Sequence, residues 1–212
     1  MNSLFPMFLK LEGKRCLVVG AGKVGELKIG GLLDTGAIVH VIALEAAQQV
    51  KEWADAGKIT LELRPFASED LDGLFLTVVA TASSSLNQSI YRDAQQRGIL
   101  CNVVDVPEYC DFYYGAVVRR GDLQIAISTN GQSPSLAQKL REQLERQFGP
   151  GYAQWVAQLG ETRQLVLASD LSPQQKSDLL HSLASREALE AALATKRAQN
   201  EIEIEKTRSV TV

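Results

Sequence analysis

The sequence has few residues of the kinds that build metal centres, disulfide frameworks or nucleic-acid-binding surfaces. Its 212 residues include two histidines and three cysteines, at spacings that fit neither a zinc site nor a disulfide framework. The formal net charge of -3 excludes a general nucleic-acid binder. No apolar run is long enough to span a membrane. We therefore expect no resident metal, no nucleic acid and no membrane, and the cysteine usage indicates a reducing cytoplasm.

The opening residues also lack the basic region and the small-residue cleavage site of a secretory signal peptide. What is present is typical of a folded globular protein, with 45% hydrophobic and 22% charged residues. The length suits one α/β domain and a smaller second one.

One short stretch, residues 15–26, carries most of the functional prediction. An apolar run ends at Gly20, and Gly22 and Gly25 complete the spacing G-x-G-x-x-G before a helical pattern. A strand that turns sharply into a helix presents backbone N–H groups and the positive end of the helix dipole, which suits a pyrophosphate. We expect Gly20 to allow the turn, Gly22 to admit a phosphate, and Gly25 to let helix and strand pack closely. The alternative is a plain turn without a ligand.

Strand-like and helical segments alternate as far as residue 104. The expected strands are 15–20, 37–43, 59–63, 74–80 and 99–104, and the expected helices are 23–34, 45–56 and one that follows Asn87 and ends at Arg97. This alternation predicts a Rossmann-like, doubly wound parallel sheet that binds its ligand at the carboxyl ends of the strands. Three loops should converge there, at residues 20–25, 81–87 and 105–107.

The pattern changes after residue 114. Residues 115–120 and 123–127 predict a β-hairpin, and Ser133 followed by Pro134 predicts the start of a helix. From residue 152 onward the chain is helical in pattern, with a polar, frayed end at 195–212. We therefore expect a dinucleotide-binding domain at 1–114, a hairpin-and-helix segment at 115–148 and a helical C-terminal domain at 149–212.

Asp105 is the main candidate for chemistry, because it follows an apolar strand at the edge where a cofactor would lie. A carboxylate there can accept a proton, and we expect it to be partly buried. The alternative is a loop aspartate that bonds nearby backbone N–H groups.

Two further residues complete the expected cofactor site. Glu45 follows the second strand, where a carboxylate can bond ribose hydroxyls and would disfavour the 2′-phosphate of NADP, so it favours NAD. The alternative is a glutamate in the first turn of a helix, stabilised by the helix dipole. Thr81 opens the second converging loop.

Positive side chains gather on the expected hairpin and the helix after it. They are Arg119, Arg120, Lys139, Arg141 and Arg146. Such a cluster could receive carboxylates, or it could be an ordinary solvated face.

Four stretches, in this order, resemble the precorrin-2 dehydrogenase family, which is the dehydrogenase and sometimes ferrochelatase module of siroheme synthases. They are residues 5–14 (FPMFLKLEGK), 17–25 (LVVGAGKVG), 102–107 (NVVDVP) and 133–141 (SPSLAQKLR). The resemblance implies an NAD-dependent oxidation of precorrin-2 to sirohydrochlorin. It also implies a homodimer interlocked through residues 115–148 and a helical C-terminal domain that covers the tetrapyrrole. The length leads us to expect a stand-alone enzyme without a methyltransferase domain.

By this resemblance, Asp105 is the carboxylate of the dehydrogenation and, in bifunctional members, of iron insertion, with ferrous iron as a substrate. The positions that match cofactor contacts are Lys23, Val24, Leu44 and Glu45. The expected contacts to the carboxylates of the tetrapyrrole are Arg119, Arg120, Thr129 and Arg141. The chain departs from the family pattern at four positions. Gly25 stands where alanine is common, and Ser83 where the family often has an acidic residue. Thr129 stands where some members have a serine that can be phosphorylated, and Gln138 where arginine is common.

A second class of function is compatible with the same glycine turn, namely an NAD-sensing regulatory module without catalytic activity. Such a module needs no base at Asp105 and no macrocycle pocket. The hairpin and basic segment after Gly115 argue against it.

Overall fold

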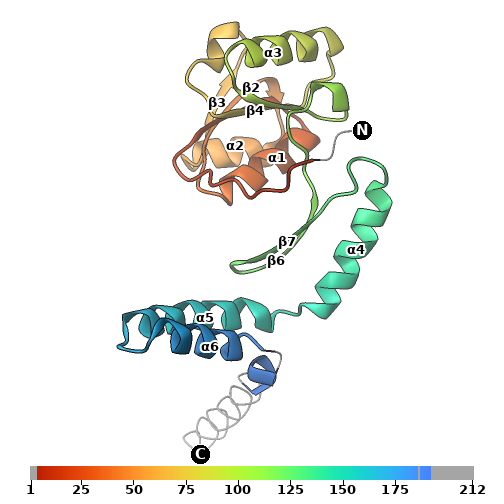
Figure 1. Cartoon of the computed structure of the whole chain (residues 1–212). Helices are drawn as coiled ribbons and strands as arrows, with labels where there is room; N and C mark the ends of the chain where they lie inside the picture. The colour runs from red at the N-terminus through yellow and green to blue at the C-terminus, as the bar shows by residue number, and fades with distance from the viewer. Residues whose placement is uncertain (1–3, 186, 192–212) are drawn as a thin grey trace, which may run out of the picture. The chain divides into compact units, whose positions relative to one another are not determined.

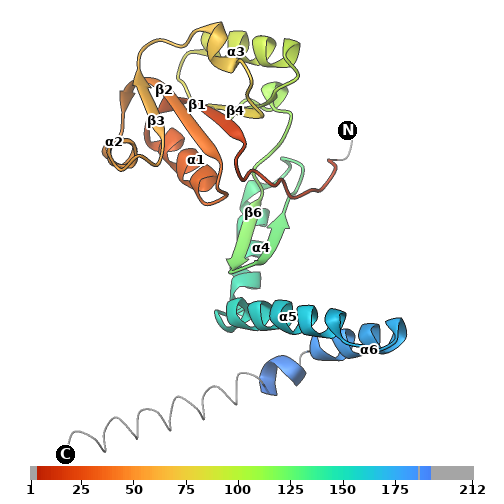
Figure 2. The same cartoon turned by 90° about the vertical axis from the view of Figure 1, so that its left-hand side faces the viewer.

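The structure is a computed structural model that describes residues 4–185 and 187–191 (Figures 1 and 2). The described chain forms two compact units, Leu4–Tyr114 and the part from Gly115 onward. We call them the first and the second unit. The expected subdivision of the second unit near residue 148 stays a prediction, and the expected frayed end at 195–212 lies outside the described residues.

The first unit is a five-stranded parallel sheet in the order β3-β2-β1-β4-β5. Its strands are β1 (Arg15–Ala21), β2 (Ile38–Ala46), β3 (Thr60–Leu63), β4 (Leu76–Val79) and β5 (Leu100–Val103). Its helices are α1 (Lys23–Leu33), α2 (Gln48–Asp55) and α3 (Ser84–Gln96), with α1 and α2 on one face of the sheet and α3 on the other (Figure 2). The strand order reverses between β1 and β4, which confirms the predicted doubly wound sheet and creates a switch point there.

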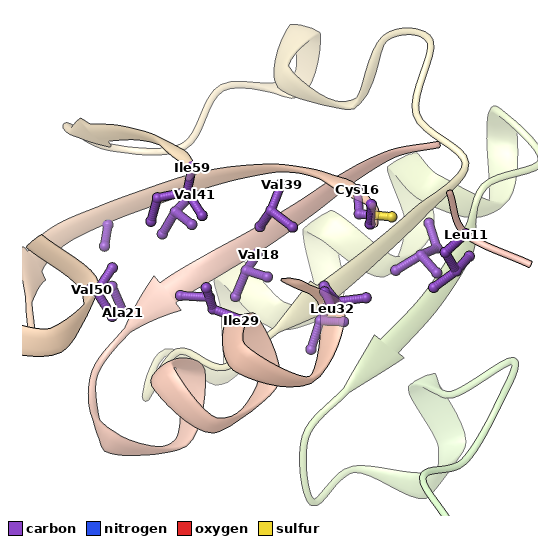
Figure 3. Close-up of a cluster of buried hydrophobic side chains, with 14 residues drawn as sticks. Leu11, Cys16, Val18, Ala21, Ile29, Leu32, Val39, Val41, Val50 and Ile59 are labelled. Carbon is purple, nitrogen blue, oxygen red and sulfur yellow. The ribbon is translucent and has the colours of Figure 1, made fainter. Parts of the chain in front are cut away.

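The central strands are apolar because helices cover both faces of the sheet. Every residue of β4 is buried. The buried hydrophobic side chains form two clusters. Figure 3 shows one of them, in which Ile29 and Leu32 point from α1 toward the sheet and face Val18 and Val39. A strand covered on both faces is largely apolar, which is why nearly continuous apolar runs predicted these strands.

The end of β2 and the starts of α2 and α3 differ from the prediction. β2 continues to Ala46, because Ala46 pairs with Ala21 of β1 and the Ala47 N–H donates to the Ala21 carbonyl at 2.8 Å. Glu45 is therefore a strand residue, and the alternative of a first-turn helix glutamate is wrong. α3 begins at Ser84, earlier than expected, because the Ser83 side chain accepts a hydrogen bond from the Leu86 N–H and caps the helix.

The Thr77 hydroxyl is buried in β4 without a hydrogen-bond partner among the residues that the structure describes. The side chain is 0% exposed, with Leu17 and Cys101 beside it in the sheet register. An unpaired buried polar group costs about 1–3 kcal/mol. We expect Thr77→Val, which exchanges the hydroxyl for a methyl group, to raise the free energy of unfolding by about 1 kcal/mol. Urea unfolding followed by circular dichroism measures this, and a lower stability would show that the hydroxyl is satisfied.

Arg64 ties the end of β3 to the turn that follows it. Its guanidinium donates to both carboxylate oxygens of Asp70, at 2.8 and 2.6 Å, and to Glu62 at 2.7 Å. The hydrogen bonds from Arg64 hold the pKa of Asp70 below its ordinary value. A carboxyl whose folded-state pKa is depressed contributes stability above its unfolded-state pKa and loses it as the pH falls through the folded-state value.

We therefore expect acid to destabilise the protein through Asp70, starting near the unfolded-state pKa of about 3.9 and continuing below it. Asp70→Asn removes this titration, so its free energy of unfolding should fall less steeply with acid than that of the unaltered chain. Asp72→Asn is the matched control, because the carboxylate of Asp72 is 69% exposed and its ion pair is screened by water. Urea unfolding at several pH values gives the slopes, and equal slopes for all three proteins would contradict the prediction.

The second unit begins with the predicted hairpin, β6 (Ala116–Arg120) and β7 (Leu123–Ile127). Three helices follow, α4 (Pro134–Gln147), α5 (Gly151–Ala168) and α6 (Pro173–Leu183), of which α5 and α6 lie side by side (Figures 1 and 2). Ser133 caps α4 as predicted, because its hydroxyl accepts a hydrogen bond from the Leu136 N–H at 3.2 Å. No helix in the described part of the chain is long and apolar enough to cross a membrane.

Candidate active site

The turn between β1 and α1 is shaped by its three glycines. Gly20 has φ +99°, and a Cβ there would overlap the carbonyl oxygen of Ala80 in the loop after β4. A Cβ at Gly25 would overlap the carbonyl oxygen of Gly20, so helix and strand pack here at backbone contact. A Cβ at Gly22 would meet nothing within 4 Å. The backbone is thus open in front of the α1 N-terminus, and the residues present fit the pyrophosphate of a dinucleotide.

The other expected cofactor contacts lie beside this turn. Lys23 and Val24 form the first turn of α1, while Leu44 and Glu45 lie at the carboxyl end of the adjacent strand β2. The Leu44 and Val24 side chains are 72% and 45% exposed. Exposed apolar side chains beside a phosphate-binding turn offer a surface on which an adenine ring can pack. Glu45 is exposed and stands where it can meet the ribose hydroxyls.

Thr81 lies in the loop after β4 and is fixed by Asn87 of α3. The Thr81 hydroxyl donates to the Asn87 amide oxygen at 2.6 Å, and the Asn87 amide donates back to the Thr81 carbonyl at 3.2 Å. Asn87 is buried. The sequence analysis did not assign Asn87 a role, although a polar residue on an otherwise apolar helix face could have suggested one.

Asp105 lies on a tight turn immediately after β5. The Val106 N–H donates to the Val103 carbonyl at 3.2 Å, and Asp105, the third residue of the turn, has φ +62°. A positive φ at this position defines a type II turn, in which glycine or asparagine is preferred. Among residues other than glycine, asparagine, aspartate and histidine adopt a positive φ most often.

The side chain of Asp105 is exposed, so the expected partial burial is wrong. The turn carries Asp105 beyond the end of β5, past the residues that bury the strand. Within residues 4–185 and 187–191 its carboxylate forms no hydrogen bond, which excludes the alternative of an aspartate that merely bonds neighbouring N–H groups. The carboxylate is thus free to act on a ligand at the carboxyl edge of the sheet.

Lys28, which the sequence analysis did not single out, adds positive charge near this carboxylate. Its ammonium lies 3.7 Å from the centroid of the Tyr114 ring, a cation–π contact. Burial lowers the pKa of Lys28, whereas the charge of Asp105 raises it. The only indication in the sequence was its place on α1, one helical turn after Val24.

The four expected contacts for tetrapyrrole carboxylates all lie in the second unit. The Arg120 guanidinium donates to the backbone carbonyls of Phe148, Glu145 and Arg119 at 2.8, 3.1 and 2.8 Å. Arg141 pairs with the Glu145 carboxylate at 2.7 Å. These two arginines therefore have internal partners, which their positive charge alone did not indicate.

The other two contacts differ in their surroundings. The Thr129 hydroxyl accepts a hydrogen bond from the Ser133 N–H at 3.1 Å, next to the start of α4. Arg119 is exposed on β6 and forms no ion pair among the residues described. Across the same residues, no group of three or more histidine, cysteine, aspartate and glutamate side chains could hold a metal ion.

Comparisons with known proteins place this geometry in a family. Residues 7–116 match the family described as putative NAD(P)-binding, and residues 120–147 match the one described as sirohaem biosynthesis protein, central. The first match covers more than half of the chain. The siroheme synthase of Nitrosococcus oceani is 42% identical over 69% of this chain and 31% of its own length. Siroheme synthase 2 of Yersinia enterocolitica is 34% identical over 95% of this chain and 42% of its own length.

A solved structure titled SirC, precorrin-2 dehydrogenase, has a TM-score of 0.78 and 27% identity, and the match covers 94% of this chain and 99% of that one. By contrast, the chain spans about a third of the length of siroheme synthases such as that of Nitrosococcus oceani.

The parallel sheet, its switch point and the glycine turn define a domain that binds a nicotinamide dinucleotide, in the doubly wound α/β class. The chain belongs to the family described as putative NAD(P)-binding, and its residues 120–147 match the central segment of sirohaem biosynthesis proteins.

Proposed function

We propose that this chain catalyses the NAD-dependent dehydrogenation of precorrin-2 to sirohydrochlorin. The observation that carries the proposal is the free Asp105 carboxylate at the carboxyl edge of the sheet that also holds the glycine turn. The likeness to a precorrin-2 dehydrogenase over nearly the whole chain supports the same reaction.

The reaction removes a hydride and a proton from the reduced macrocycle. NAD, when bound at the glycine turn, supplies the hydride acceptor. Asp105 accepts the proton, because its carboxylate has no competing hydrogen bond among the described residues and stands at the ligand-binding edge. Lys28 contributes a positive charge near this carboxylate. Thr81 lies in the loop after β4, the strand between β1, which leads into the glycine turn, and β5, which leads into the Asp105 turn.

We further propose that NAD is preferred to NADP because of Glu45. Its carboxylate would repel the 2′-phosphate of NADP and accept hydrogen bonds from the ribose of NAD. We expect Glu45→Arg to raise the ratio of kcat/KM for NADP to that for NAD by about tenfold, a change of about 1.4 kcal/mol. Initial rates of NADH and NADPH formation measure the ratio, and Glu52→Arg, on the exposed side of α2, is the control. An unchanged ratio would exclude Glu45 as the selective residue.

The substrate contacts and the assembly remain part of the proposal. Arg119 offers a guanidinium to the carboxylates of the tetrapyrrole, while Arg120, Arg141 and Thr129 contact the substrate or hold the backbone around Arg119. Residues 115–148 are proposed to join two copies into a homodimer. The three free thiols of the chain support a reducing cytoplasm.

An anaerobic assay that follows NADH formation from precorrin-2 tests the proposal. We expect stoichiometric NADH and sirohydrochlorin, and no NADH would overturn the dehydrogenase assignment. The assay repeated with ferrous iron and sirohydrochlorin tests iron insertion, for which Asp105 is the candidate acceptor of the pyrrole protons. If neither reaction occurs and sirohydrochlorin does not bind at micromolar concentration, the chain is an NAD-sensing module.

A further inference from the structure

The thiol of Cys110 lies against the turn that carries Asp105. Its Sγ is 3.1 Å from the carbonyl oxygen of Val103 and 3.3 Å from that of Val106. Val103 and Val106 are the first and last residues of the turn. A single S–H can be shared between two such carbonyls as a three-centre hydrogen bond, so one side chain contacts both ends of the turn.

Cys110 is itself held in place by buried neighbours. The Asn102 amide donates to Sγ at 3.4 Å and to the Phe112 carbonyl at 2.8 Å. Asn102 lies in β5 and is buried, and its backbone pairs with that of Cys110 in an antiparallel bridge. The segment after the turn thus folds back along β5, and this return brings the thiol to both ends of the turn that carries Asp105.

The thiol keeps the hydrogen that this arrangement needs. Burial raises the pKa of Cys110, so the group is protonated and can donate at neutral pH. Both carbonyl oxygens that the thiol faces accept hydrogen bonds, and a thiolate, which has no hydrogen to donate, would contact them less favourably.

We propose that Cys110 is a positioning residue for the dehydrogenation, because its thiol holds both ends of the turn and so keeps Asp105 in its left-handed conformation. The inference rests on the proposed role of Asp105. Without the thiol the turn can relax, because a positive φ such as the +62° of Asp105 is uncommon for residues other than glycine. The carboxylate would then lose its fixed place relative to the substrate, and small displacements of a catalytic group are costly in rate.

Three variants of the full chain test this inference. Cys110→Ala removes the donor, Cys110→Ser keeps a donor at the same place, and Cys101→Ala removes a thiol from the neighbouring buried position in β5 without touching the turn. The measurements are kcat and the KM for NAD in the anaerobic assay, and hydrogen exchange at the Val106 amide, which donates across the turn.

For Cys110→Ala we expect kcat to fall about 10- to 100-fold, with the KM for NAD within about twofold of the unaltered value and faster exchange at Val106. Cys110→Ser should recover most of kcat and the slow exchange. Cys101→Ala should lower the melting temperature while kcat and the Val106 exchange stay unchanged.

Normal kcat and slow Val106 exchange in Cys110→Ala would overturn the inference, as would equal losses in the alanine and serine variants. If the unaltered chain forms no NADH, the proposed function fails and the catalytic part of the inference fails with it. In that case the Val106 exchange still decides whether Cys110 holds the turn, so the two failures are distinguishable.

Discussion

Asp105→Asn should lower the rate of NADH formation by about 10²- to 10⁴-fold, the usual contribution of a general base. The amide cannot accept the proton that the carboxylate takes from the macrocycle. The fold should not change, because asparagine adopts a positive φ at least as readily as aspartate and the carboxylate has no hydrogen bond to lose in the described chain. Affinity for NAD should also persist, since the glycine turn is intact. Single-turnover rates, NAD titration and melting temperature measure these three quantities.

Glu108→Gln is the matched control for Asp105→Asn. Glu108 is an exposed carboxylate on the short 3-10 helix Pro107–Tyr109, three residues further along the chain. The substitution Glu108→Gln removes the same charge from the same region but not from the turn, so the rate of NADH formation should stay within about twofold of normal. Normal turnover in Asp105→Asn would show that another group accepts the proton. Equal losses in both variants would show that charge in this region, rather than a base, is what the reaction needs.

Gly20→Ala should strongly destabilise the first unit, by about 3 kcal/mol or more, because two costs combine. The backbone at Gly20 has φ +99°, which L side chains rarely adopt, and the new methyl group would overlap the Ala80 carbonyl oxygen and lie 2.8 Å from its carbon. Since the obstacle is backbone of a neighbouring loop, no side chain can move aside. Urea unfolding measures the loss, and wild-type stability would show that the turn adapts.

Gly22→Ala distinguishes the effect of this turn on stability from its effect on ligand binding. A Cβ at Gly22 meets nothing within 4 Å, and its φ of -74° is ordinary, so stability should be unchanged within about 0.5 kcal/mol. The methyl group would instead occupy the space through which a phosphate approaches the backbone. We expect the variant to unfold normally and to bind NAD about tenfold more weakly or worse, as titration of the purified protein would show. Unchanged affinity would mean that the phosphates lie elsewhere.

The sheet could be predicted from the sequence because burial on both faces requires continuous apolar runs. The end of β2 could not, because Leu44 and Glu45 are exposed and resemble the start of a helix. What extends this strand is the pairing of Ala46 with Ala21, a contact across the sheet that no local pattern records.

The site was predictable only in part. A place after a central strand indicated Asp105, because strand ends meet at one edge of a parallel sheet. Its exposure follows from the turn that carries it beyond β5, the thiol of Cys110 that contacts both ends of this turn comes from the returning segment, and its positive neighbour Lys28 comes from another element. Charge likewise suggested Arg120 as a ligand contact, but it could not indicate that the Arg120 guanidinium donates to carbonyls near the end of α4.

The strand order also sets the distance between the glycine turn and the Asp105 turn, which a bound cofactor would have to span. The glycine turn follows β1 and the Asp105 turn follows β5, with β4 hydrogen-bonded between them. Adjacent strands lie about 4.8 Å apart, so the two turns are separated sideways by about 10 Å, whatever the sequences of their loops. In the proposed reaction, a dinucleotide anchored by its phosphates at β1 would extend across β4 to bring its nicotinamide ring to the Asp105 carboxylate. Shorter anionic ligands such as free nucleoside diphosphates could occupy the first turn but would leave Asp105 without a hydride acceptor beside it.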